Sequence, residues 1–184
     1  MTEPTSANPR VQDILRKIVP SLRKSDRILD VGAGSCEVAK ALVDAGFNVK
    51  PIDVVNKSLY KNLAPMIYDG KTLPFPDNSF DVVLLITVLH HIKDPIEVLR
   101  EAKRVAPKII LMEDLHTNIF QKYLTFAMDS FMNREFLGHP HTNKTKEEWE
   151  KVFADLDLIV RSTDIHNFWR FFTSGTFILE RRYR

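Results

Sequence analysis

The sequence predicts an α/β protein with a doubly wound, mostly parallel sheet of seven strands and an antiparallel hairpin at the C-terminal end. Short apolar runs alternate with helical patterns from residue 27 to residue 112, which is typical of parallel strands joined by right-handed helical crossovers. The run at residues 82–86 is continuously apolar, as in strands that are buried on both faces. The last two segments, 156–165 and 170–180, alternate closely enough to form the hairpin.

Length and composition are those of one globular domain, which we expect to cover residues 1–184. The chain is 44% hydrophobic and 27% charged, which is ordinary for a soluble protein. Its net charge is only +2, and its one basic cluster is Arg181, Arg182 and Arg184, so nothing indicates nucleic acid as a partner. No secretory signal or membrane-length apolar run is recognised, so we expect a cytoplasmic protein without a membrane span. The oligomeric state stays open.

The first half of the chain begins with a helical segment within residues 1–24. Its apolar residues fall at helical spacing before Pro20, and they are Val11, Ile14, Leu15, Ile18 and Val19. Strands are expected at 27–31, 47–53 and 65–68, with a helix at 35–45 and at most a short helix around 57–63. The helix at 35–45 is expected to stop at Gly46 and to bury Val38, Ala39, Leu42 and Val43.

The second half begins with a turn-rich loop at residues 73–79, ahead of the strand at 82–86. Asp94, Pro95 and Glu97 are typical of the N-cap, first residue and capping-box partner of a helix. The expected apolar face of this helix consists of Ile96, Leu99, Ala102 and Val105. A fifth strand is expected at 108–112, followed by a helical insertion at 116–154 in which Thr145 and Glu148 cap a shorter helix that runs to Phe153.

Residues 27–36 are the most informative about function. An apolar strand ends around Asp30 and passes through a turn with Gly32 and Gly34 into a helix, and such a turn lets a ligand approach the backbone closely. Asp53 closes the next strand, 21 residues after Gly32, where a carboxylate can bind a ribose diol. Together these features predict a site for an adenosine-bearing cofactor.

Two acidic residues indicate which adenosine cofactor this is. A dinucleotide site needs a third glycine for close helix packing, and the bulky Glu37 occupies that position. Asp30 suits a positively charged ligand, and S-adenosylmethionine carries an ammonium and a sulfonium but no phosphate. Ligands of parallel sheets bind at the carboxyl ends of strands, where Asp30, Asp53, Asp69 and residues 87–90 lie. The sequence therefore predicts S-adenosylmethionine as the cofactor.

Longer motifs carry a family resemblance over about residues 25–112. They lie at 73–83, 88–92, 94–95 and 104–105, and read Leu-Pro-Phe-Pro-Asp-Asn-Ser-Phe-Asp-Val-Val, Val-Leu-His-His-Ile, Asp-Pro and Arg-Val. In these motifs the chain resembles the class I S-adenosylmethionine-dependent methyltransferases, which have a Rossmann-like fold, and most closely their small-molecule type 11 group.

The resemblance implies how the cofactor would be held. The implied binding residues are Asp30, Gly32, Ala33 and Gly34 around the methionine part, Thr87 under the methionyl end, Asp53 and Val54 at the ribose, and Asp69 and Gly70 at the adenine. The family usually has a third glycine where this chain has Cys36, a departure that could narrow the cofactor cleft. This lone cysteine excludes an internal disulfide, and without an identified partner base we expect it to be a small core residue.

Histidines are the candidates for catalysis. His90 and His91 follow the fourth strand, where one of them could act as a general base near neutral pH. In the alternative interpretation His90 packs in the core and His91 orders the loop. No metal site is expected, because His116, His139 and His141 match no known ligand spacing, although they could line the acceptor pocket.

The aromatic stripe at residues 120–136 is either a core helix or the wall of an apolar acceptor pocket. Its only basic residues are Lys122 and Arg134, which disfavours contact with a membrane surface. The predicted function is methyl transfer to a small, partly apolar acceptor, with the methylated atom left open. The first alternative is a non-catalytic protein that binds S-adenosylmethionine or S-adenosylhomocysteine. The second, an adenine-dinucleotide oxidoreductase, is disfavoured by Glu37 and Asp69.

Overall fold

A computed structural model describes residues 8–115, 144–168 and 172–182, which form one seven-stranded sheet in the order β3-β2-β1-β4-β5-β7-β6. The strands are β1 (Arg27–Val31), β2 (Asn48–Asp53), β3 (Met66–Ile67), β4 (Val82–Ile86), β5 (Lys108–Leu115), β6 (Leu158–Phe168) and β7 (Phe172–Arg181). The first five run parallel, and β7 pairs antiparallel with both β5 and β6. The predicted doubly wound sheet with a C-terminal hairpin is confirmed.

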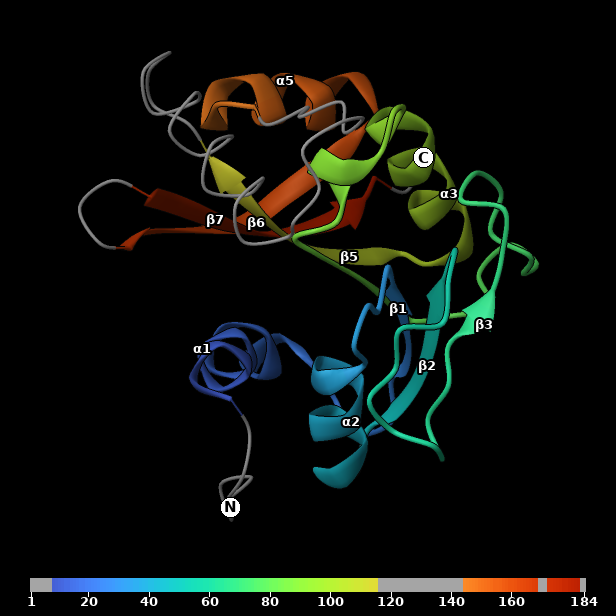
Figure 1. The fold of residues 1–184 in the computed structure, drawn as a ribbon. Coiled ribbons are helices and arrows are strands. Elements are labelled where there is room, and N and C mark those ends of the chain that lie inside the picture. Colours follow the sequence, from blue (N-terminus) through green and yellow to red (C-terminus); the bar gives the residue numbers. More distant parts are fainter. Residues whose placement is uncertain (1–7, 116–143, 169–171, 183–184) are drawn as a thin grey trace.

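Helices cover both faces of the sheet, as Figure 1 shows. On one face lie α1 (Pro9–Ile18), extended by the short turn η1 (Val19–Ser21), and α2 (Glu37–Asp44); on the other lie α3 (Pro95–Val105) and α5 (Lys146–Asp155). Successive residues of β4 serve the two layers, because Val82 and Leu84 pack with α1 and α2 while Val83 and Leu85 pack with α3 and α5. This double burial explains why the run is continuously apolar.

Side-chain caps start three of the helices. Asn8 Oδ1 accepts a hydrogen bond of 2.9 Å from Arg10 N at the start of α1, and Asp94 caps α3 as predicted. Thr145 and Glu148 form a full capping box on α5, with bonds of 2.7 and 3.2 Å. The predicted reciprocal bond from Glu97 in α3 is not the one observed, because the Glu97 carboxylate pairs with Arg100 in the next turn.

The sequence allowed at most a short helix around residues 57–63, and the structure has turns and bends over residues 54–65 instead. Ser58 Oγ accepts from Tyr60 N at 3.0 Å and lies 2.8 Å from Leu63 O, while Asn56 Oδ1 accepts from Ser58 N at 3.0 Å. Short polar side chains that bond nearby backbone in this way compete with helix formation. The backbone groups in this segment therefore find hydrogen-bond partners without forming a helix.

Three smaller expectations about packing also need correction. Val43 is 38% exposed and does not face the core; Ala41 is buried in α2 instead. In α3 it is Val98 that is fully buried, while Ile96 is only partly buried against the same core. The fifth strand continues past residue 112 to residue 115, because its partner β7 supplies antiparallel pairing over the added length.

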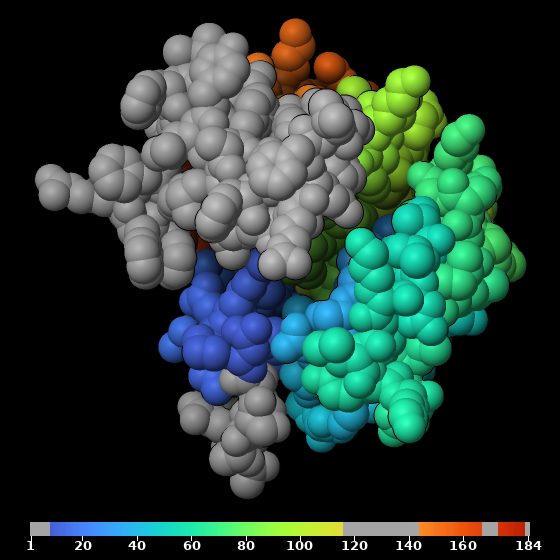
Figure 2. All heavy atoms as spheres, in the orientation of Figure 1, coloured from blue at the N-terminus to red at the C-terminus, as the bar shows by residue number. Residues whose placement is uncertain are grey.

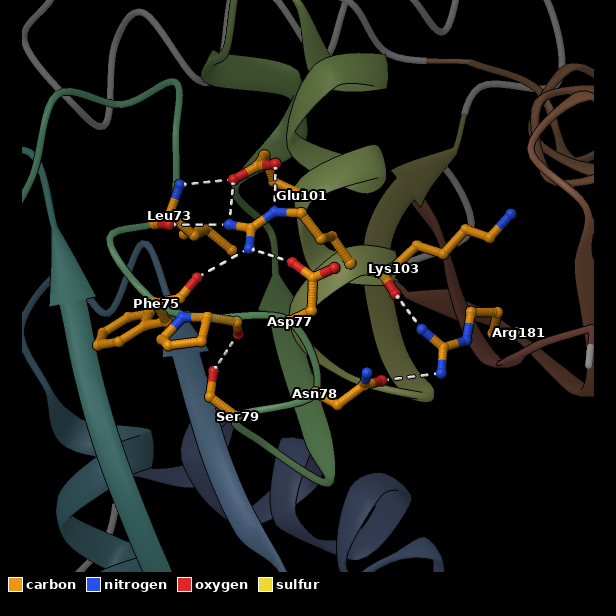
Figure 3. A network of polar contacts seen from close by, with 10 residues as sticks. Leu73, Phe75, Asp77, Asn78, Ser79, Glu101, Lys103 and Arg181 are labelled. Atoms are coloured by element: carbon orange, nitrogen blue, oxygen red, sulfur yellow. Dashed lines mark hydrogen bonds and ion pairs between the residues drawn. The ribbon is translucent and has the colours of Figure 1, made fainter.

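The turn-rich loop at residues 73–79 is anchored by the guanidinium of Arg104, in the network that Figure 3 shows. Arg104 donates to Phe75 O at 2.8 Å, Asp77 Oδ1 at 2.8 Å and Leu73 O at 3.0 Å, and it pairs with Glu101 at 2.7 Å. Glu101 in turn accepts from Leu73 N at 2.9 Å. Proline has no backbone N–H, so a proline-rich loop has few donors for its own carbonyl oxygens. The N–H groups of Arg104 donate to two of these carbonyl oxygens. The motif therefore ties the loop to α3.

The predicted single domain over residues 1–184 stays a prediction, as does most of the expected helical insertion. Residues 116–143 lie outside the described ranges, and so do the expected acceptor stripe at 120–136 and the histidines His116, His139 and His141. Over the described residues, none of the helices is both long and apolar enough to cross a membrane.

Candidate cofactor cleft

A cleft of about 680 Å³ opens at the carboxyl ends of β1, β2 and β4. Figure 2 shows a recess in this region, between the blue N-terminal helix and the teal segment that follows β2. Nine of the predicted site residues line the cleft, namely Asp30, Gly32, Ala33, Gly34, Asp53, Val54, Gly70, Thr87 and His91. Asp69 and His90 are not among the lining residues. The volume lies in the range of small-molecule sites.

The glycine turn is docked on the neighbouring strand by its own backbone. Gly32 N donates to Ile52 O at 2.9 Å, and Gly34 N donates to Asp53 Oδ2 at 2.8 Å. Gly32 has φ +73°, and a Cβ at this position would lie 2.2 Å from Val88 Cγ2. A side chain at Gly32 would therefore both strain the backbone and displace the loop after β4.

Cys36 does not narrow the cleft, contrary to the expectation from its place in the motif. The residue is fully buried, does not line the cleft, and burial raises the pKa of its thiol. Its backbone has φ +59°, in the left-handed region that favours glycine. The backbone conformation thus accounts for the family's usual glycine, and this chain holds the same conformation with a cysteine.

Cys36→Gly is expected to change the free energy of unfolding by less than about 1 kcal/mol, because relief of the left-handed strain offsets the lost burial. Affinity for S-adenosylhomocysteine should be equal or higher, as the thiol does not line the cleft. Thermal melting and calorimetry would test this. Cys36→Val is the matched control, since a β-branched side chain at positive φ should clearly destabilise the fold. Weaker binding by Cys36→Gly alone would show that the thiol supports the site.

Asp53 holds together the two segments beside it. Its Oδ2 accepts from Gly34 N, and its Oδ1 accepts from Val54 N at 2.7 Å and from Val55 N at 3.3 Å. Because each carboxylate oxygen can accept two hydrogen bonds, the group keeps acceptor capacity toward the cleft that it lines. The predicted ribose contact fits this arrangement.

Asp30 is a buried acid with an unpaired oxygen. The residue is 3% exposed, lines the cleft, and its Oδ2 has no hydrogen-bond partner among the described residues. Burial, with a smaller contribution from the charge of Asp53, raises the pKa of Asp30 to about 7. A buried carboxyl without a partner is unfavourable, so its place at the cleft indicates a cationic or hydrogen-bonding ligand.

Asp69 is exposed and serves its own turn. Its Oδ1 accepts from Lys71 N at 2.8 Å and from Thr72 N at 2.9 Å, and these bonds lower its pKa. Its neighbours Tyr68 and Gly70 line the cleft instead, and burial raises the pKa of Tyr68 to about 12. The predicted adenine contact of Asp69 therefore stays a prediction, and Tyr68 is a lining residue that the sequence interpretation missed.

A buried glutamate positions the loop after β4. Glu113 is 1% exposed; its Oε1 accepts from Val88 N at 2.9 Å and from Leu89 N at 2.6 Å, and its Oε2 lies 2.6 Å from His90 Nδ1. These bonds fix the short turn η2 (Leu89–His91). His90 is thus 5% exposed and faces Glu113, whereas the exposed His91 lines the cleft. Of the two histidines, only His91 is placed for contact with a ligand.

Besides Tyr68, the sequence interpretation missed Glu113 and the N-terminal helix. Glu113 had a detectable signal, an acid that directly follows the apolar run of the fifth strand. The N-terminal helix gave none, although Asn8 and Arg10 line the cleft and Arg10 Nη2 donates to Thr87 Oγ1 at 3.1 Å. That contact joins residues 77 positions apart, and only the packing of α1 on the sheet brings them together.

Comparison with known proteins covers the segment of the chain that forms this cleft. The family described as a methyltransferase domain matches residues 29–108, which include the glycine turn, Asp53 and the loop after β4. Among curated proteins, 27-O-demethylrifamycin SV methyltransferase of Amycolatopsis mediterranei is 36% identical over 54% of this chain and 41% of its own length. Demethylmenaquinone methyltransferase of Renibacterium salmoninarum is 30% identical over 59% of this chain and 52% of its own. The chain thus spans about half the length of these relatives.

Solved structures share the whole fold. A crystal structure of an S-adenosylmethionine-dependent methyltransferase from Methanosarcina mazei has a TM-score of 0.70 at 19% identity, covering 91% of this chain and 98% of its own. Magnesium protoporphyrin IX methyltransferase from Synechocystis, solved with bound S-adenosylhomocysteine, has a TM-score of 0.68 at 17% identity over 94% and 82% of the two chains. Residues 29–108 thus match the methyltransferase-domain family, and the described residues have the fold of these methyltransferase structures, as the motifs around the first and fourth strands predicted.

Proposed function

We propose that the cleft binds S-adenosylmethionine and that the protein transfers a methyl group to a small, partly apolar acceptor. The observation that carries the proposal is the buried carboxyl of Asp30, with its unpaired Oδ2 at a glycine-lined cleft. A ligand with an ammonium group would pair that oxygen. The acids Asp30, Glu37 and Asp53 outnumber the cations Arg10 and Lys57 in the lining, and Glu37 stands where a dinucleotide turn needs its third glycine.

The other lining residues fit the rest of this cofactor. The turn leaves open space at Gly34, where a Cβ would lie 4.0 Å from its nearest atom, and Asp53 lies beside it at the end of β2. Val54 and Val55 are 56% and 45% exposed at the same end, where an aromatic base would cover them. Along the cleft, the lining therefore offers the apolar surface of Val54 and Val55, a carboxylate suited to a diol at Asp53, and the buried acid Asp30.

For methyl transfer, the protein has to align the cofactor with the acceptor and to exclude water from the site. When bound, S-adenosylmethionine supplies an electrophilic methyl group. Asp30 and Asp53 would hold its two halves in fixed positions, which converts binding energy into alignment with the acceptor. For an acceptor that must lose a proton, His91 is the candidate base because it lines the cleft. His90, hydrogen-bonded to Glu113, would act on the loop and not on the substrate.

The proposed acceptor class rests on two kinds of support. The relatives are named for a rifamycin derivative and for demethylmenaquinone, both of which are small molecules. The aromatic segment at residues 120–136, with the histidines at 139 and 141, was predicted to wall an apolar acceptor pocket. A non-catalytic protein that binds the same cofactor is the alternative, and a blocked acceptor pocket would favour it. Transfer of a labelled methyl group to demethylated quinones would separate the two.

Binding of the cofactor is tested first. S-adenosylmethionine and S-adenosylhomocysteine should raise the melting temperature, whereas NAD should not, because Glu37 occupies the position where a dinucleotide turn needs its third glycine. Asp53→Ala should weaken S-adenosylhomocysteine binding by about 2 kcal/mol, the value of charge-assisted hydrogen bonds. Asp69→Ala is the comparison, and its effect should be smaller because Asp69 does not line the cleft. Stabilisation by NAD, or unchanged affinity in Asp53→Ala, would contradict the proposed cofactor placement.

A further inference from the structure

The N-terminal helix contributes a cation to one end of the cleft. Arg10 lies in the first turn of α1 and lines the cleft together with Asn8. Its Nη2 donates to Thr87 Oγ1, so the guanidinium is held at the carboxyl end of β4. Val11 and Ile14, on the same helix, are buried against the sheet. Arg10 is therefore carried by a fixed element of the fold.

Acidic and basic side chains line different parts of the cleft. The β2 end carries Asp53 and, from the segment beyond it, Lys57. Toward β4 lie the buried Asp30 of β1 and Arg10, which is held at Thr87. The lining also includes His91, from the turn after β4, and Glu37, whose carboxylate accepts from Ser35 Oγ. β1 and β4 are adjacent strands, with Asp30 paired to Leu84 in register. An acid and a permanent cation thus stand at neighbouring strand ends.

We infer that Arg10 binds the carboxylate of the amino-acid part of the cofactor, while Asp30 binds its ammonium. This inference rests on the proposed function of the cleft. An amino-acid group is a zwitterion, and an unpaired buried acid next to a guanidinium complements both of its charges. A guanidinium has five N–H donors, and the bond to Thr87 uses one of them. The N-terminus of α1 adds positive potential at the same end.

The ligand pair that tests this differs only in the carboxylate: S-adenosylmethionine and decarboxylated S-adenosylmethionine. The unchanged protein should bind the first about tenfold or more tightly, as expected for one charge-assisted contact. Arg10→Gln should lose that preference, with weaker binding of S-adenosylmethionine and affinity for the decarboxylated ligand within about twofold of the original. Arg10→Lys should keep part of the preference, because it retains the charge without the fork.

Arg16→Gln is the matched control. Arg16 lies on the same helix, its side chain is 75% exposed, and it pairs with Asp13 away from the cleft lining. This variant should bind both ligands as the unchanged protein does. If the unchanged protein binds both ligands equally, or if Arg10→Gln weakens both equally, the inference is wrong while the proposed cofactor stands. If the unchanged protein binds neither ligand, the proposed function itself is wrong, and the inference with it.

Discussion

Glu113→Ala is expected to lower the free energy of unfolding by about 3–5 kcal/mol, because it removes three hydrogen bonds of a buried carboxylate, at about 1–3 kcal/mol for each polar group that loses its partner. The carboxylate is 1% exposed and accepts from the backbone N–H groups of Val88 and Leu89 while it faces His90 Nδ1. Alanine would remove the carboxylate that accepts from the backbone N–H groups of Val88 and Leu89 and that faces His90, and it would leave a cavity in its place. Few other single changes in the described residues would remove so many buried contacts at once.

The same variant should also weaken the site, because Val88 follows Thr87 directly and η2 carries His91. Urea unfolding measures the stability, and calorimetry with S-adenosylhomocysteine measures the site. Glu113→Gln is the control: its amide oxygen can still accept from the backbone, so most of the stability should return. A loss below 1 kcal/mol in Glu113→Ala would show that solvent or a rearranged loop replaces the network. A double-mutant cycle of Glu113→Ala and His90→Ala would measure the coupling energy between these two side chains.

The central strands β1 and β4 were predictable from the sequence because they are buried on both faces. Their expected bounds are those observed, since short, mainly apolar runs between turn residues are typical of such strands. The end of β5 was missed because Glu113 interrupts the apolar pattern. A buried acid is stable there only through partners from the loop after β4, and those tertiary contacts leave no periodic signal.

The acids Asp30 and Asp53 of the site were equally predictable from the sequence, whereas the basic residue Arg10 was not. Asp30 and Asp53 end adjacent parallel strands, so strand topology alone brings them together. Arg10 reaches the cleft because α1 packs across the sheet at an angle set by its buried face. That angle depends on side-chain packing over the whole layer, which a single sequence does not reveal. Asp69 shows the converse, since its motif position was recognised but its side chain bonds its own turn.

Asp30→Asn is expected to stabilise the protein without ligand at alkaline pH. Burial, and then the charge of Asp53, raises the pKa of Asp30 from 3.8 to about 7 in the folded state. The folded protein therefore holds this proton more tightly than the unfolded chain. The contribution of Asp30 to stability falls as the pH rises from 4 to 7, in total by on the order of 4 kcal/mol. Asparagine removes this dependence, so its advantage should be larger at pH 8 than at pH 5.

The same substitution should have the opposite effect on cofactor binding. The ionised form of Asp30 is the one that pairs with an ammonium, so affinity for S-adenosylhomocysteine should rise from pH 5.5 to 7.5 by up to about tenfold per pH unit below the pKa. Asp30→Asn should bind more weakly at pH 7.5 and lose most of the slope. Binding at pH 6.5 should also release a proton, which calorimetry in buffers of different ionisation enthalpy detects.

The asparagine variant also separates Asp30 from the other ionisable groups that line the cleft. These are Arg10, Glu37, Asp53, Lys57, Tyr68 and His91, and of them an unperturbed histidine would also titrate between pH 5.5 and 7.5. If His91 caused the slope, Asp30→Asn would keep it and His91→Asn would remove it. Identical pH profiles for the unchanged protein and Asp30→Asn would therefore contradict the assignment of Asp30 as the ammonium-binding acid. A stability gain at pH 8 together with a lost slope would mean that this buried acid is unfavourable for the fold and required by the ligand.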